Sequence, residues 1–393
     1  MDRKVELLAP AGDLERLKIS LLYGADAVYI GGQEYSLRAN ANNFSIEEIR
    51  EACEFAHNLG KKVYLTLNIV FHNEDLENVY SFIKEVVEAK IDAFIVSDPF
   101  IIKYIKDNFD VEVHLSTQAS TTNVDSVKYW KQEGIDRVVL AREVSIKEIS
   151  EIYNETKLDL EVFIHGAMCT FYSGRCCLSN YFTNRDSNRG GCAQICRFAF
   201  DIEDEETKFT MATKDLNMAS ILDKLISSGV KSLKVEGRMR SPYYLATVIS
   251  SYRKLIDAYY SNQLTEELIK KEELILSRVA NRETSTHYYL KEADYTDQYY
   301  TGRQELSNQD FLALVLDYDK DSKIATITER NYFKIGDEVE IFTPNGDIYS
   351  FKIEKLYDEK MNPIDVARHP EEILKIEVDY PVVKDSMMRI KIV

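Results

Sequence analysis

Cysteines are the residues of this chain whose type and spacing most clearly could do chemistry. Four of the six lie close together in the sequence: Cys169, Cys176, Cys192 and Cys196. Spacings of seven, sixteen and four residues suit a tetrahedral zinc ion or an iron-sulfur cluster, because both take four sulfur ligands. The tight Cys-x-x-Cys hooks of zinc knuckles are missing, which favours a cluster. Cys177 follows Cys176 directly, and neighbours in an extended segment point opposite ways, so we expect Cys176 to face the metal.

A cysteine nucleophile is the alternative use of the same residues. His165 lies four residues before Cys169 and is the obvious base to activate a thiol. A structural role for His165 is equally open. The sequence contains neither His-Glu-x-x-His nor Gly-x-Ser-x-Gly, so the standard metallopeptidase and serine hydrolase mechanisms have no basis here.

A second group of reactive residue types lies in the segment Lys234-Val-Glu236-Gly-Arg238-Met-Arg240. Arginine binds carboxylates through a bidentate fork, so Lys234, Arg238 and Arg240 suit a small dicarboxylate. Glu236 is a candidate catalytic carboxylate among them. The alternative is that these basic residues only balance the charge of Glu236 and nearby acids.

An alternation of strands and helices is expected to position these residues. The predicted strands are 5–8, 27–30, 63–67, 93–96, 111–115, 137–140, 160–164 and 232–235. Amphipathic helical patterns separate them, and two open on a capping box, Ser45 with Glu48 and Ser145 with Glu148. The alternation favours an α/β fold, a parallel (β/α)8-type barrel over residues 1–260, although a doubly wound sheet gives the same pattern.

In such a barrel the active face is built from the residues that follow each strand. Here many of them are polar: Asn68, Asp98, Ser116, Gln118, Arg142, Glu143, His165, Glu236 and Arg238. The cysteines follow the seventh strand, in an insertion over residues 166–215. Loops between strand and helix are usually far shorter, so this insertion is predicted to be functional.

The rest of the chain has a different pattern. Residues 261–305 are expected to form a connector, with a helix over Glu266–Val279 and a tyrosine-rich segment suited to packing between domains or to stacking on bases. Residues 306–393 alternate by twos around a turn at Pro344-Asn-Gly-Asp, which predicts a small, β-barrel-like domain. We expect that domain to orient a substrate or partner and to perform no chemistry.

Charge and hydropathy limit the partners. A net charge of −17 opposes general attraction to nucleic acid, so any RNA contact must be local. Two windows with several basic residues, 162–200 and 228–254, could supply it, with Arg189 and Arg240 as candidate contacts. No signal-type or membrane-spanning apolar run occurs, so we expect a cytoplasmic protein without a membrane partner, whose reduced thiols serve a metal or catalysis.

Several motifs resemble one family. They include Leu8-Ala-Pro-Ala-Gly12, the run Glu161-x-Phe163-x-x-Gly166-Ala-Met-Cys169-x4-Gly174-x-Cys176, and Gly190-Gly-Cys192-Ala-Gln-Ile-Cys196-Arg197. Together with the segment from 234 to 244, they are similar to the collagenase-like peptidase family, the thirty-second among the unassigned peptidases. The resemblance covers roughly residues 5–282.

This resemblance implies a function. Members of the family are similar to oxygen-independent hydroxylation proteins that hold a 4Fe-4S cluster. The single barrel and the small β-domain most resemble the branch that makes 5-hydroxyuridine at the wobble position of tRNA, with prephenate as a required metabolite. By this resemblance the four clustered cysteines would ligate the cluster, and His165 would orient a neighbouring group or move a proton.

The chain departs from the family's pattern after Asn281-Arg282, where Glu-Thr-Ser-Thr-His287 stands in place of a glycine and aromatic-rich run. This departure leaves the exact RNA open and allows for a paralogous subunit that works with this chain. A peptidase using Cys169 or Cys176 with His165 is the second hypothesis. A non-catalytic iron-sulfur or zinc subunit is the third.

Overall fold

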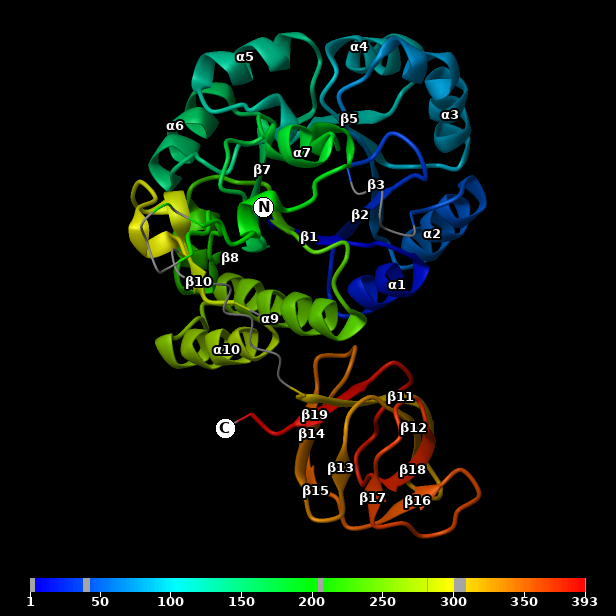
Figure 1. Cartoon of the computed structure of the whole chain (residues 1–393). Helices are drawn as coiled ribbons and strands as arrows, with labels where there is room; N and C mark the ends of the chain where they lie inside the picture. Colours follow the sequence, from blue (N-terminus) through cyan, green and yellow to red (C-terminus); the bar gives the residue numbers. More distant parts are fainter. Residues whose placement is uncertain are drawn as a thin grey trace.

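The protein is described by a computed structural model that covers residues 4–37, 43–201, 203, 208–280, 282–299 and 309–392. Eight parallel strands close into a barrel (Figure 1). They are β1 (Glu6–Pro10), β2 (Ala27–Gly31), β3 (Lys62–Leu67), β4 (Ala93–Val96), β5 (Glu112–Leu115), β6 (Arg137–Val139), β7 (Asp159–Gly166) and β9 (Ser232–Val235). Strand β9 pairs in parallel with both β7 and β1, which closes the ring and confirms the predicted barrel.

Helices surround the barrel: α1 (Leu14–Leu22), α2 (Ile46–Asn58), α3 (Leu76–Glu88), α4 (Pro99–Asn108), α5 (Val124–Gln132), α6 (Ile146–Thr156), α8 (Leu222–Ser227) and α9 (Pro242–Tyr260). Their apolar faces lie against the strands; in α3, Val79, Ile83 and Val86 are buried at helical spacing. Both predicted capping boxes are present, at the starts of α2 and α6.

The insertion after β7 contains little regular structure. Its described part holds the short helix α7 (Leu178–Thr183) and two 3-10 turns, Ser187–Arg189 and Ile195–Arg197. It returns through β8 (Asp215–Asn217), which runs antiparallel to the end of β7 and also pairs with β10 (Thr284–Ser285). These two strands were not predicted, because each is two or three residues long and mostly polar.

The connector helix α10 (Glu266–Val279) has the predicted bounds and packs on α9. The tyrosine-rich segment then packs against the barrel: the Tyr289 hydroxyl donates to the carbonyl of Phe163 at 2.6 Å. Tyr300 and Asn281 lie outside the described residues. The domain boundaries proposed at 260 and 305 stay predictions.

The C-terminal domain is an antiparallel seven-stranded sheet in the order β15-β14-β19-β11-β12-β18-β16, accompanied by the pair β13-β17. Its strands are β11 (Phe311–Asp319), β12 (Ile324–Glu329), β13 (Phe333–Lys334), β14 (Glu338–Phe342), β15 (Ile348–Lys352), β16 (Leu356–Asp358), β17 (Val366–Ala367), β18 (Ile373–Glu377) and β19 (Met387–Ile390). The predicted turn at 344–347 joins β14 to β15. This all-β domain is therefore confirmed.

The two domains meet at α1 and α9 (Figure 1). Tyr243 of α9 stacks on Phe311, with ring centroids 4.6 Å apart. Tyr23, at the end of α1, donates its hydroxyl to the carbonyl of Asp385 at 2.8 Å. Within the described part of the chain, no helix is long and apolar enough to cross a bilayer.

Candidate active site

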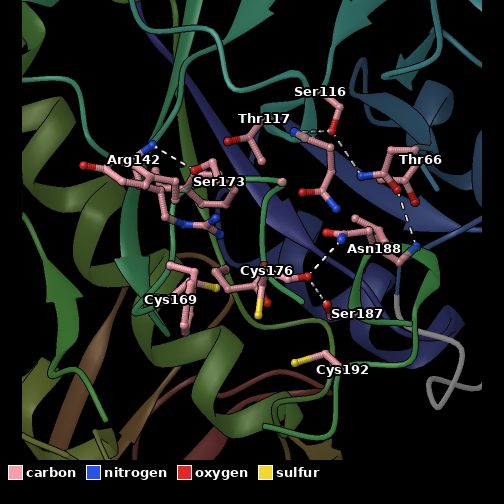
Figure 2. Close-up of a pocket in the computed structure, with 18 of the residues that line it drawn as sticks. Thr66, Ser116, Thr117, Arg142, Cys169, Ser173, Cys176, Ser187, Asn188 and Cys192 are labelled. Carbon is pink, nitrogen blue, oxygen red and sulfur yellow. Dashed lines mark hydrogen bonds between the residues drawn. The ribbon is translucent and has the colours of Figure 1, made fainter. Parts of the chain in front are cut away.

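A cavity of about 160 Å³ lies where the barrel strands end, beneath the insertion. Its walls come from two sources, the polar residues that follow the strands and the cysteine-bearing insertion (Figure 2). The residues from the strand ends include Asn68, Ser116, Gln118, Arg142, Glu236 and Arg238. The insertion contributes all four clustered cysteines, Cys169, Cys176, Cys192 and Cys196. The four cysteines and several of the polar residues that follow the strands, which lie far apart in the sequence, thus share one cavity.

A glycine allows the insertion to approach the barrel. Gly174 has a φ of +74°, and a Cβ atom there would come within 2.3 Å of the Gln118 carbonyl oxygen. Only glycine fits such a position without strain. Close to it, the backbone N–H of Ser173 donates to Glu143 at 2.9 Å. The segment between Cys169 and Cys176 is therefore fixed against the ends of β5 and β6.

Side chains further along the insertion hold Cys176 in place. Both Ser187 and Asn188 donate to the carbonyl of Cys176, at 2.5 and 2.9 Å (Figure 2). The carbonyl of Asn188 accepts from the Val70 backbone at 3.0 Å, which ties this turn to the loop after β3. Cys177 is exposed, precedes α7 and is not among the residues that line the cavity.

The cysteines influence each other electrostatically. Burial raises the pKa of the Cys196 thiol, and the neighbouring thiols of Cys169, Cys192 and Cys176 raise it further against the opposing effect of Arg197. Among the described residues, no three His, Cys, Asp or Glu side chains converge closely enough to hold a single metal ion. Four thiols around one cavity do match the donor set of a four-iron cluster, whose ligands bind different irons and so stand further apart.

Cys53 differs from these four. It is buried in α2, outside the cavity, and burial, with a smaller effect from Asp92, raises the pKa of its thiol to about 12.

His165 lies behind the cavity wall and is not one of its lining residues. It is buried between Tyr244 and Tyr252, and its Nδ1 lies 3.3 Å from the Tyr252 hydroxyl. Burial, followed by the nearby charge of Arg240, lowers the pKa of His165 to about 3. The imidazole is therefore neutral at physiological pH and is oriented by Tyr252. The structure does not bring His165 together with the cysteines as a base.

Lys234 points into the barrel and is neutralised there. Its ammonium lies 2.8 Å from Glu161, which is fully buried and also pairs with Arg137. Burial would raise the pKa of Glu161, but Lys234 and Arg137 outweigh it and lower this pKa to about 2. Lys234 therefore lines the cavity as one end of a buried ion network.

Glu236 and Arg238 also line the cavity. The Tyr29 hydroxyl donates to Glu236 at 3.2 Å. Arg238 donates to the hydroxyl of Ser36 and to the carbonyl of Leu37, both at 2.9 Å. These bonds hold the Arg238 guanidinium against the loop after β2.

Arg189 and Arg240, the two predicted RNA contacts, do not line the cavity. Arg240 sits 3.4 Å from Asp215 and 5.0 Å from the Tyr244 ring centroid. Arg189 binds Asp75, with one N–O distance of 3.1 Å, and donates to the carbonyl of Val70 at 2.7 Å. Both arginines therefore have structural partners within this chain.

The sequence did not single out Tyr29 or Phe163 as site residues, although both line the cavity. They lie on β2 and β7 with side chains directed into the barrel mouth. Inward-facing aromatic residues look like core in a sequence, because strand alternation does not reveal which end of the barrel is open.

The fold and the site define a class of protein: a (β/α)8 barrel with a thiol-lined cavity beneath a long insertion. Comparison with known proteins identifies the family. Residues 12–299 match Peptidase family U32, and residues 307–389 match the Peptidase family U32 C-terminal domain. The chain belongs to this family, as its motifs predicted.

Three relatives carry different names. "tRNA hydroxylation protein P1" of Bacillus subtilis is 47% identical, over 98% of this chain and 95% of the relative. "23S rRNA 5-hydroxycytidine C2501 synthase" of Escherichia coli is 38% identical, over 65% of this chain and 40% of the relative. "Collagenase" of Porphyromonas gingivalis is 33% identical, over 89% of both chains.

Proposed function

We propose that this protein is an RNA-modifying enzyme that hydroxylates the wobble uridine of tRNA to 5-hydroxyuridine. In this proposal it uses a 4Fe-4S cluster and takes prephenate as co-substrate, without oxygen. The observation that carries the proposal is the convergence of Cys169, Cys176, Cys192 and Cys196 on one cavity. The near full-length similarity to a protein named for tRNA hydroxylation supports the choice of RNA. With a tRNA substrate, the protein would act in the cytoplasm.

The cysteines would hold the cluster through their thiolates. When bound, the cluster would supply redox-active iron beside the cavity. The chain's own residues would do the rest. Glu236, held by Tyr29, places a carboxylate at the cavity that can accept or return a proton. His165 would act as a neutral support behind the wall, together with Tyr252.

The insertion carries exposed side chains that suit single-stranded RNA, and one of them, Tyr172, also lines the cavity. Aromatic side chains there are strongly exposed: Tyr172 (69%), Tyr181 (84%), Phe182 (52%) and Phe198 (52%). Two exposed arginines, Arg175 and Arg185, lie among them in the sequence. Bases of a single strand stack on aromatic rings while basic groups meet the phosphates. We call the six residues the insertion surface, and propose that it receives the anticodon loop.

A peptidase is the second candidate, because the family carries that label and one relative is named "Collagenase". A cysteine peptidase needs a base within reach of its thiol. His165 is buried behind the cavity and bonded to Tyr252, which argues against it in that role. The geometry therefore supports hydroxylation better.

Metal analysis after anaerobic purification tests the proposal. About four irons and four sulfides per chain are expected for one cluster. One zinc and no iron would contradict the proposal and favour a zinc subunit. A cluster-loaded protein that leaves tRNA unmodified unless a paralogous chain is added would make this chain a partner subunit and contradict its assignment as the complete enzyme.

A further inference from the structure

Arg142 is a cation of the cavity that the mechanism above does not use. It follows β6, and its guanidinium lies 3.9 Å from the centroid of the Phe163 ring. Its Nε is buried without a hydrogen-bond partner. Among the described residues, its side chain makes no hydrogen bond or ion pair; only its backbone N–H is bonded, to Ser173 at 3.3 Å. The neighbouring Glu143 is directed to Ser173 instead of to Arg142.

The other cations of the cavity differ in this respect. Lys234 is neutralised by Glu161 at 2.8 Å, and Arg238 is bonded to Ser36 and Leu37. A half-buried charge without a partner costs free energy unless a bound ligand supplies the opposite charge. Stacking on Phe163 fixes the plane of the Arg142 guanidinium and leaves its hydrogen-bonding edge for an anion.

The cavity indicates what kind of anion this is. The planar fork of arginine matches a carboxylate. Apolar Phe163, Phe171 and Ile95 and neutral polar Asn68 and Ser116 also line the walls. A ligand with an apolar body and a carboxylate end fits this lining.

We infer that Arg142 is the carboxylate-binding residue of this cavity and that its ligand is a small organic acid. The inference deepens the proposed function and rests on it for the ligand's role as co-substrate. The sequence assigned carboxylate binding to Lys234, Arg238 and Arg240. Lys234 and Arg238 are bonded within the chain, and Arg240 pairs with Asp215 outside the cavity, so we assign this role to Arg142.

Calorimetric titration of the anaerobically purified, iron-loaded protein tests the inference. The probes are prephenate, phenylpyruvate and the methyl ester of phenylpyruvate. Arg142→Met should weaken binding of both acids by about 10- to 100-fold, the worth of a charge-assisted bidentate pair, with iron content unchanged. Arg142→Lys should fall between this variant and the wild type. Arg368→Met, at an exposed arginine of the C-terminal domain, is the matched control and should bind like the wild type.

Three results would overturn the inference: unchanged affinity in Arg142→Met, ester binding as tight as acid binding by the wild type, or no acid binding by the wild type. The ester comparison and Arg142→Lys decide the matter if Arg142→Met fails to fold. If Arg142→Met weakens the binding of tRNA but not of the acids, the residue binds an RNA phosphate, and this result would also overturn the inference. If Arg142→Met leaves acid affinity, iron content and 5-hydroxyuridine unchanged, only this inference is contradicted. If acid binding depends on Arg142 but the protein holds no iron, only the proposed function is contradicted.

Discussion

Individual residues take their roles here from their partners. Lys234, Arg238 and Arg240 share one short segment, yet Lys234 pairs with Glu161, Arg238 with the loop after β2, and Arg240 with Asp215. The sequence placed Lys234 and Arg238 near the barrel mouth because they lie at the end of a predicted strand and just after it. It could not assign their partners; the pair of Lys234 with Glu161, for example, depends on the register between β7 and β9. The sequence placed Arg142 at the active face, but its lack of a side-chain hydrogen-bond partner among the described residues is visible only in three dimensions.

The buried His165 predicts how the stability of the protein depends on pH. Its folded-state pKa of about 3 lies below the ordinary 6.5, so the unfolded chain takes up the proton first as the pH falls. The burial of a neutral imidazole therefore costs no stability above pH 6.5, and it lowers the free energy of unfolding progressively as the pH falls toward 3. His165→Gln should therefore make the unfolding free energy less dependent on pH in this window, by up to about 1.4 kcal/mol per pH unit.

Urea unfolding of wild type and His165→Gln at several pH values between about 7 and 5 measures this difference. His72→Gln, a substitution at an exposed residue, controls for the exchange itself. Equal pH slopes for wild type and His165→Gln would contradict a buried neutral imidazole.

Whole elements were predictable where a repeating pattern specifies them. The eight barrel strands and α10 follow from apolar periodicity, and the starts of α2 and α6 from their capping boxes. Strands β8 and β10 could not be predicted, because two or three mostly polar residues carry no periodicity. The path of the insertion was equally hidden. It depends on single contacts, such as those of Ser187 and Asn188 with the Cys176 carbonyl.

Substitution of Gly174 tests whether its close contact with the loop after β5 positions the insertion. Gly174→Ala places a Cβ within 2.3 Å of the Gln118 carbonyl and strains a backbone with φ of +74°, so the segment between Cys169 and Cys176 must move. We expect bound iron to fall severalfold while the barrel's helical circular dichroism persists. Gly60→Ala is the matched control, because Gly60 has a φ of +67° but nothing within 4 Å. It should cost about 1 kcal/mol of stability and leave iron bound. Full iron content in Gly174→Ala would contradict this account of the insertion.

At the scale of the molecule, the chemistry and the domain contact lie on different parts of the barrel. The contact between domains uses Tyr23, Tyr243 and Phe311, none of which lines the cavity. The sequence predicted both domains but not their arrangement, because Tyr23 and Tyr243 look like ordinary helix residues. A role for the C-terminal domain in orienting a substrate or partner stays a prediction.

RNA recognition is also a property of the whole molecule, because the net charge is −17. Arg189 and Arg240 have partners in this chain and are therefore weaker candidates for RNA contact. Arg175 and Arg185 of the insertion surface are exposed and are the better candidates. Arg175→Glu and Arg185→Glu should each weaken tRNA affinity several-fold and lower its salt dependence. Lys352→Glu, at an exposed site of the C-terminal domain, is the charge-matched control and should have little effect.

Filter binding of tRNA under anaerobic conditions at two salt concentrations measures these affinities. A Tyr181→Ala variant adds a test of stacking, which is worth about 1–3 kcal/mol per base. Equal losses from Lys352→Glu and the insertion variants would argue against the insertion surface as the RNA site.

The central claim is that four thiolates hold one cluster that hydroxylation requires. Its most direct test is nucleoside mass spectrometry of tRNA from cells lacking this protein and complemented with single Cys→Ser variants, beside iron analysis of each variant. Replacement of Cys169, Cys176, Cys192 or Cys196 should lower bound iron and wobble 5-hydroxyuridine together, because the ligands act as a unit. Cys53→Ser should have little effect, since Cys53 is buried away from the cavity, and Cys177→Ser should have less effect than Cys176→Ser. Wild-type levels of 5-hydroxyuridine in the Cys192→Ser and Cys196→Ser variants would contradict the account.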